Sequence, residues 1–132
     1  MQILAFDFGE KKIGVAVGQT ETCTSSPLGV VFCGRSKTYW NVIESILNEW
    51  KPDLVIIGKP LNMDGTESEI MKKVEKFYKK LTVIYEAKYE FIDERLTTFE
   101  AKEILKTRKH DAIDSNAAKI LIDNWFEINV KN

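Results

Sequence analysis

The chain has 132 residues, of which 44% are hydrophobic and 30% charged, and its formal net charge is −1. This balance is typical of a globular protein, so we expect residues 1–132 to form one domain around a buried core. The apolar stretch from Ile3 is short and contains Asp7, which argues against a signal peptide or a membrane span. We therefore expect a cytoplasmic protein in which Cys23 and Cys33, which lack metal-site spacing, are free thiols. The net charge counts mildly against nucleic-acid binding, but basic residues can still cluster beside acidic ones.

Three strands are predicted in the first third of the chain, over residues 2–8, 13–17 and 28–33. The first is a continuous apolar run interrupted only by Asp7. The connections between these strands are short, which favours antiparallel pairing of neighbours.

A helix is predicted over residues 40–50, because apolar residues recur there at three- and four-residue spacing and Pro52 follows. The apolar run 53–58 then predicts a strand buried on both faces, as in a parallel sheet flanked by helices. The pattern Thr66-x-x-Glu69 is typical of a capping box and predicts the start of a second helix.

The end of that second helix stays open, because residues 82–85 suit either a last helical turn or a short strand. A fifth strand is predicted over residues 89–92, followed by a helix from Thr97 to about Lys106. A final helix starts near Asp111. Strands followed by alternating helices and strands predict a mixed α/β sheet with helices on its faces.

Acidic residues occur at three distant points that such a sheet can bring together. Asp7 lies inside an apolar strand, where an unpaired charge costs several kcal/mol. Glu94 follows a later strand, and Asp114 lies in the first turn of the last helix. A divalent cation shared by such carboxylates is one compensation for the buried charge, and it indicates metal-dependent nuclease chemistry.

Each acid also has a purely structural interpretation. Asp7 suits a buried salt bridge or a strand-end cap. Glu94 suits a solvated loop, and Asp93 competes with it because adjacent strand residues face opposite ways. If Asp111 is the N-cap, Asp114 occupies the third helical position, where an acid is favoured anyway. Asp111 is therefore read first as an N-cap and second as an accessory metal ligand.

Basic and amide side chains are placed where they could hold a phosphate backbone around the acids. Lys59 and Asn62 lie in the loop between a buried strand and a helix start, which suits phosphate binding, with a purely structural connection as the alternative. The basic run 106–110 is otherwise a solvated loop, and Arg95 is otherwise an ion-pair partner of Asp93 or Glu94. The nucleic-acid-binding candidates are Lys11, Lys12, Lys59, Asn62, Arg95, Arg108 and Lys109.

Four motifs, in order along nearly the whole chain, resemble those of the YqgF/RuvX family. They are Ala5-Phe6-Asp7-Phe8-Gly9 with Ile13-Gly14-Val15-Ala16, Gly58-Lys59-Pro60-Leu61-Asn62-Met63-Asp64-Gly65-Thr66, Asp93-Glu94-Arg95-Leu96-Thr97-Thr98, and Ile113-Asp114-Ser115-x-Ala117-Ala118. The resemblance implies an RNase H-like fold, with three antiparallel strands and then parallel strands in a five-stranded sheet flanked by helices. It also implies that Asp7, Glu94 and Asp114 are the catalytic and metal-binding residues.

The implied activity is phosphodiester hydrolysis with two Mg²⁺ or Mn²⁺ ions, on one of two nucleic-acid substrates. We favour processing of the 5′ end of pre-16S ribosomal RNA by a monomer or weak homodimer. The alternative is a Holliday junction resolvase, which would need a stable two-fold dimer, and the sequence shows no evident dimer surface. A non-catalytic nucleic-acid-binding module is an alternative of another class. A sugar-kinase type of phosphotransferase would need a second domain.

Overall fold

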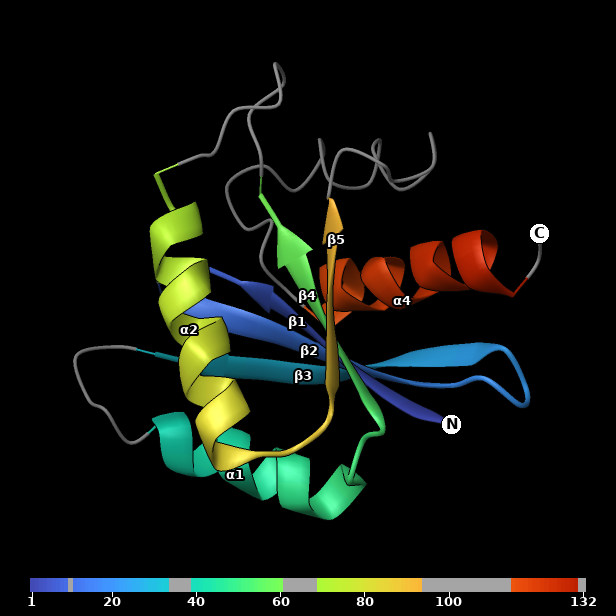
Figure 1. Ribbon diagram of the computed structural model, residues 1–132, viewed down its shortest axis with the longest axis horizontal. Coiled ribbons are helices and arrows are strands. Elements are labelled where there is room, and N and C mark those ends of the chain that lie inside the picture. Colours follow the sequence, from blue (N-terminus) through green and yellow to red (C-terminus); the bar gives the residue numbers. More distant parts are fainter. Residues whose placement is uncertain (10, 34–38, 61–68, 94–114, 131–132) are drawn as a thin grey trace.

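The computed structural model describes residues 1–9, 11–33, 39–60, 69–93 and 115–130. Their core is a five-stranded sheet with the spatial order β3-β2-β1-β4-β5 (Figure 1). The strands are β1 (Gln2–Phe8), β2 (Lys12–Gln19), β3 (Thr24–Phe32), β4 (Leu54–Lys59) and β5 (Lys88–Asp93). The first three pair antiparallel, whereas β4 pairs parallel to β1 and β5 pairs parallel to β4. The predicted mixed sheet is thereby confirmed.

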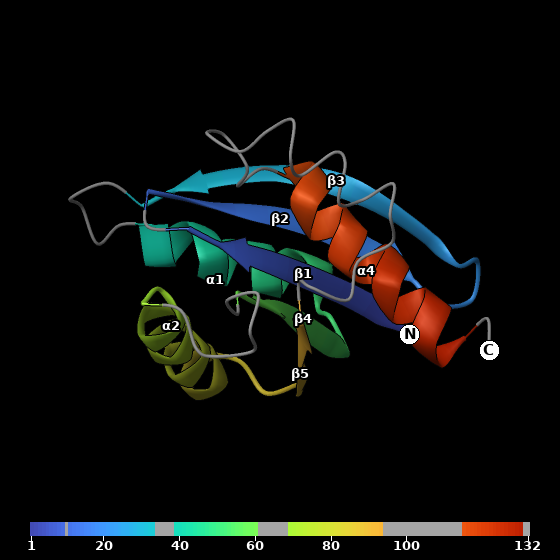
Figure 2. The same cartoon turned by 90° about the horizontal axis from the view of Figure 1, so that it is seen from above.

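Helices cover both faces of this sheet. Helices α1 (Tyr39–Trp50) and α2 (Met71–Ile84) pack on one face, and among the described helices only α4 (Ser115–Asn129) packs on the other (Figure 2). We call these the α1/α2 face and the α4 face. Central strands between two helical layers are buried on both sides, and residues 3–6 of β1 and 54–57 of β4 are accordingly 0% exposed.

Strand alternation divides the core into two clusters, and this division decides which side chains can meet. Leu4 and Phe6 of β1 pack in the cluster under α1 and α2. Ile3 and Ala5 pack in the cluster under α4. Side chains alternate between the two faces along a strand. Residues an even number of positions apart in one strand therefore share a face, and we say that they have the same parity.

Strand β3 begins earlier than the prediction of 28–33. It starts at Thr24 and ends at Phe32, and its polar first half lacks the apolar pattern that sequence reasoning requires. The strand lies at the edge of the sheet, where one side needs no pairing and Pro27 is tolerated. Its register shifts opposite Val15 and Ala16, which indicates a bulge at Leu28.

Helix α2 also starts later than its predicted capping box. It begins at Met71 with Ile70 at the N-cap position, and no side chain caps it there. Thr66 itself lies outside the described residues. The open question at its other end has a clear answer, because the helix runs to Ile84 and Tyr85 is extended. The helix predicted for residues 97–106 and the expected start of the last helix near Asp111 also lie outside the described residues.

Candidate functional site

Asp7 lies near the carboxyl end of β1 and is only 4% exposed. It shares parity with Ile3 and Ala5, so its side chain belongs to the α4 face. Across the antiparallel pair it lies opposite Gly14. In the parallel pair with β4, Phe6 is level with Ile57, so the next residues along are Asp7 and Gly58. Both neighbouring positions are therefore glycines, which carry no side chain.

The carboxyl end of β5 lies at the same edge of the sheet. Ile92 is level with Gly58 and packs in the cluster under α4, on the same face as Asp7. Asp93 has the opposite parity and falls with Phe91 on the α1/α2 face. The side chains of Asp93 and Asp7 therefore lie on opposite faces of the sheet, so Asp93 does not share a site with Asp7 on the α4 face.

Three predicted basic residues are described, and they gather at this edge of the sheet. Lys12 opens β2 and shares parity with Gly14 and Ala16, so it lies on the α4 face beside Asp7. Lys11 is exposed in the turn before it. Lys59 ends β4 on the opposite face, level with Asp93.

The other predicted site residues lie outside the described residues. They are Asn62, Glu94, Arg95, Arg108, Lys109, Asp111 and Asp114. All of them except Asn62 lie in the segment between the end of β5 at Asp93 and the start of α4 at Ser115. Ile122 in the second half of α4 lies against Gly18, which pairs with Ile3 near the start of β1, so the first turn of α4 points toward the carboxyl edge of β1.

The donor chemistry of this edge fits a hard divalent cation. Asp7 supplies carboxylate oxygen, the ligand that Mg²⁺ and Mn²⁺ prefer, and the flanking glycines leave room beside it. Within the described ranges, no group of three or more histidine, cysteine, aspartate or glutamate side chains forms a complete metal site.

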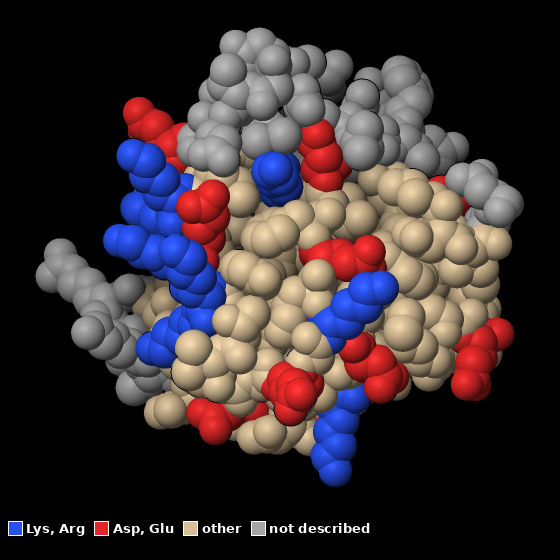
Figure 3. Space-filling model, in the orientation of Figure 1, with Lys and Arg blue, Asp and Glu red and all other residues tan. Residues whose placement is uncertain are grey.

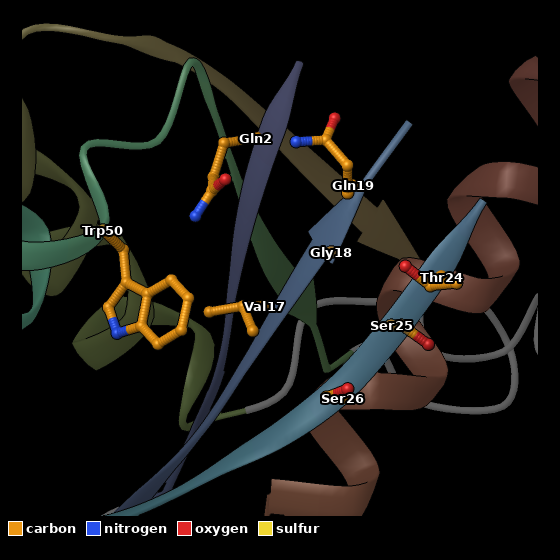
Figure 4. A pocket seen from close by; sticks show the side chains of 8 residues that line it. All are labelled: Gln2, Val17, Gly18, Gln19, Thr24, Ser25, Ser26 and Trp50. Atoms are coloured by element: carbon orange, nitrogen blue, oxygen red, sulfur yellow. The ribbon is translucent and has the colours of Figure 1, made fainter. Parts of the chain in front are cut away.

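Two hollows are lined by described residues other than Asp7. A cavity of about 110 Å³ is lined by residues from the start of β1, the end of β2, the start of β3 and Trp50 of α1 (Figure 4). Its residue Gln2 is five positions before Asp7, roughly 17 Å along the strand, and no acid lines the cavity. A larger groove of about 290 Å³ lies on the α1/α2 face and is lined by Phe8, Tyr39, Trp40, Lys73, Lys76, Phe77 and Lys80.

That lysine–aromatic groove was not anticipated from the sequence, although a signal for it existed. Lys73, Lys76 and Lys80 recur at helical spacing and therefore share one side of α2. The sequence did not show that Tyr39 and Trp40 of α1 would face them, because that contact depends on how two helices pack.

The chain matches one described family over almost its entire length. The family described as "RuvX: Holliday junction resolvase" matches residues 1–128. A protein of Saccharophagus degradans named "Putative pre-16S rRNA nuclease" is 44% identical over 130 residues, covering 94% of this chain and 92% of that relative. A protein of Hahella chejuensis with the same name is 42% identical, covering 98% and 86% of the two chains.

Solved structures support the fold. The structure titled "T. thermophilus RuvC in complex with Holliday junction substrate" matches with a TM-score of 0.63 at 14% identity, covering 98% of this chain and 97% of that one. The fowlpox virus Holliday junction resolvase matches with a TM-score of 0.54 at 16% identity, covering 97% and 99%. With the observed strand order, these likenesses confirm the predicted RNase H-like fold. Among the described helices, none is long and apolar enough to cross a membrane.

Proposed function

The chain belongs to the RuvX family, and on this premise we propose that it is a divalent-metal-dependent nuclease that processes the 5′ end of pre-16S ribosomal RNA. The names of its relatives in Saccharophagus degradans and Hahella chejuensis support the RNA substrate. Such a role belongs in the cytoplasm, where precursor ribosomal RNA is available. Cleavage of one RNA strand requires only a monomer or a weak homodimer.

The observation that carries this proposal is the position of Asp7. A carboxylate that is 4% exposed sits at the carboxyl edge of the sheet, between two strand positions occupied by glycine. Burial of a carboxylate is costly unless partners offset it. An edge where parallel strands end is also where open α/β sheets bind ligands.

Glu94 and Asp114 are the proposed companions of Asp7. Glu94 follows Asp93 directly, and continued alternation from Glu90 and Ile92 would turn it toward the α4 face. Asp114 immediately precedes the first residue of α4, the helix that covers that face. The three acids would together hold two Mg²⁺ or Mn²⁺ ions, with Asp111 as a further candidate ligand. Bound in pairs, such ions activate water and stabilise the leaving oxygen of a phosphodiester.

Basic residues at the edge are proposed to hold the nucleic-acid backbone. Lys12 lies on the face of Asp7, and Lys11 is exposed next to it. Asn62, Arg95, Arg108 and Lys109 are proposed to act with them and with Lys59. Cationic and amide side chains bind phosphate oxygens without reading the base sequence, so these contacts would position a strand for cleavage.

Junction resolution is the second candidate, because the matched family is itself described by that activity. A resolvase makes two symmetric cuts and so requires a two-fold dimer with two sites. The two functions therefore differ in substrate and in assembly, and both can be measured.

The deciding experiment is cleavage of single-stranded RNA, single-stranded DNA and a four-way DNA junction with Mg²⁺ or Mn²⁺, and with chelator. Wild type is compared with Asp7→Asn, which removes the charge with little change in volume. We expect metal-dependent cleavage of RNA that Asp7→Asn abolishes. Preferred cutting of the junction by a dimer would favour the resolvase instead. Equal cleavage by wild type and Asp7→Asn would refute the assigned site.

A further inference from the structure

Helix α2 carries the strongest concentration of positive charge in the described part of the chain. Its sequence contains five lysines and one glutamate, a net charge of +4 in a protein whose total is −1. All five lysines are exposed. Figure 3 shows the resulting basic surface along the side of the molecule formed by α2. Nothing in the folding of an amphipathic helix requires that nearly all of its charges have one sign.

Three of these lysines face aromatic side chains across the groove described above. Lys73, Lys76 and Lys80 line it together with Tyr39 and Trp40 at the start of α1. By helical rise, Lys73 and Lys80 are separated by about 10 Å along the axis, the length occupied by about three phosphates of a stacked strand.

The aromatic side of the groove is a connected set of rings. Trp40 lies 5.4 Å from Tyr39 and 5.2 Å from Phe77, between ring centroids. The Lys80 Nζ atom lies over the Trp40 ring, 4.6 Å from its centroid. Tyr39 and Trp40 are only half-buried, so they present an apolar surface at the rim of the groove. Cations beside partly exposed rings are the combination that holds single-stranded nucleic acid by its phosphates and by base stacking.

We propose that this lysine–aromatic groove binds a single strand of nucleic acid, with Lys73, Lys76 and Lys80 on the phosphates and Tyr39 and Trp40 against a base. Charge complementarity selects a polyanion, and the aromatic rim selects one with unpaired bases. A duplex keeps its bases stacked inside and cannot use that rim.

The groove reaches the carboxyl end of β1, at the edge of the sheet where the candidate cleavage site lies on the other face. Phe8 lines it and directly follows Asp7 along β1, with the two side chains on opposite faces of the sheet. A strand that crosses the carboxyl edge at Asp7 can therefore continue along α2. The inference rests on the proposed function only in identifying this strand as the substrate. Binding itself requires no cleavage.

The test is fluorescence anisotropy with a labelled 20-nucleotide single-stranded RNA, in chelator so that no strand is cut, over a series of salt concentrations. The groove variant replaces Lys73, Lys76 and Lys80 by glutamine. The matched control replaces Lys72, Lys79 and Lys88 by glutamine as well. These three lysines are exposed but do not line the groove. Both variants lose three positive charges, and circular dichroism verifies that both fold.

We expect the groove variant to bind at least about 10-fold more weakly and the control less than about 3-fold. A plot of log affinity against log salt has a negative slope, and its magnitude should be smaller by about 2 in the groove variant. Each lost phosphate contact on a single strand removes about 0.7 from that magnitude. Equal weakening in both variants would overturn the proposal, as would no weakening in either. Single-stranded DNA in place of RNA tests whether the 2′-hydroxyl contributes.

Two further arms test the aromatic part. A strand containing 4-thiouridine should cross-link to the peptide containing Tyr39 and Trp40, and cross-links confined to other surfaces would overturn the proposal. A labelled polyglutamate of equal charge should bind at least about 10-fold more weakly than the RNA, because it has no bases to stack. Equal affinity would mean that charge alone is recognised. If wild type binds through the groove but never cleaves, the groove stands and the nuclease proposal falls.

Discussion

The indole Nε1 of Trp125 in α4 donates a 2.9 Å hydrogen bond to the carboxylate of Glu90 in β5. This contact fixes the Glu90 side chain on the α4 face. Ile92, two residues on, packs in the cluster under the same helix. The alternation along β5 is therefore anchored at two points, and it assigns Asp93 to the face that Asp7 does not use.

The first prediction compares the two adjacent acids at the end of β5. We expect Glu94→Gln to reduce metal-dependent cleavage by about 100-fold or more, the scale of losing one group that stabilises transition-state charge. Asp93→Asn should retain cleavage to within a few-fold, because its side chain lies on the α1/α2 face. Initial rates at saturating metal measure both variants. A larger loss in Asp93→Asn than in Glu94→Gln would contradict the assignment.

The second prediction concerns the hydrogen bond itself. Trp125→Phe keeps most of the apolar contact in the α4 cluster but removes the donor to Glu90. We expect the free energy of unfolding to fall by about 1–2 kcal/mol, as for loss of a hydrogen bond to a charged group at a partly buried site. Urea denaturation measures the change. Glu90→Gln keeps an acceptor and should cost less, so the reverse order would count against this interpretation.

The third prediction tests the packing of α4 against the end of β2. A Cβ atom added to Gly18 would lie 2.7 Å from Cγ2 of Ile122 and 3.3 Å from the backbone oxygen of Thr24. We expect Gly18→Ala to lower the free energy of unfolding by about 1–3 kcal/mol through overpacking.

A double-mutant cycle identifies the contact responsible. Ile122→Ala removes the nearest atom and creates a cavity of its own, so both single variants are destabilised. The double variant should lose less stability than the sum of the two by about 0.5 kcal/mol or more, because each change relieves the other. Strict additivity would show that the strain arises elsewhere.

The fourth prediction concerns pH. The Tyr89 hydroxyl donates to the backbone oxygens of Leu81 and Tyr85, at 3.1 and 2.7 Å. Burial, followed by the neighbouring Tyr85 and Tyr78, raises the pKa of Tyr89 from its usual 10.0 to about 12. The folded state therefore holds this proton more tightly than the unfolded state, so the stabilisation is complete below pH 10 and is lost as the pH rises through 12.

Tyr89→Phe isolates this effect. The variant should be less stable than wild type by about 1 kcal/mol at pH 8, because it lacks the hydroxyl hydrogen bonds. The difference should shrink between pH 10 and 12 as the wild-type hydroxyl ionises. Urea unfolding across this range measures it, and a difference that stays constant to pH 12 would contradict the raised pKa.

The fifth prediction concerns the two cysteines, both of which are free thiols, as the sequence predicted. Cys23 is exposed, whereas Cys33 is buried and its burial raises the pKa of its thiol. Since the thiolate is the reactive form, Ellman's reagent should modify Cys23 quickly and Cys33 slowly at pH 8. Cys23→Ser should remove the fast phase, and Cys33→Ser should leave it. A single fast phase of two thiols would show that Cys33 is accessible.

Much of the fold could be predicted because its strongest signals are local. The runs at residues 3–6 and 54–57 are apolar on both faces. That pattern is typical of a strand buried between two layers of helices. The helix at α1 followed from its apolar spacing and from Pro52. The start of β3 could not be predicted in this way, because Thr24, Ser25 and Ser26 are polar and pair there only as part of a sheet edge.

For the candidate site, too, some features follow from the sequence and others only from the tertiary structure. By itself the sequence determined that Asp7 is an acid within an apolar strand, that further acids follow distant elements, and that the motifs resemble one family. Tertiary structure alone decided that glycines flank Asp7, that Asp93 faces away from it, and that the lysines of α2 meet the rings of α1. The reason is physical: apolar periodicity records which side chains are buried, whereas strand register and helix packing decide which of them are neighbours.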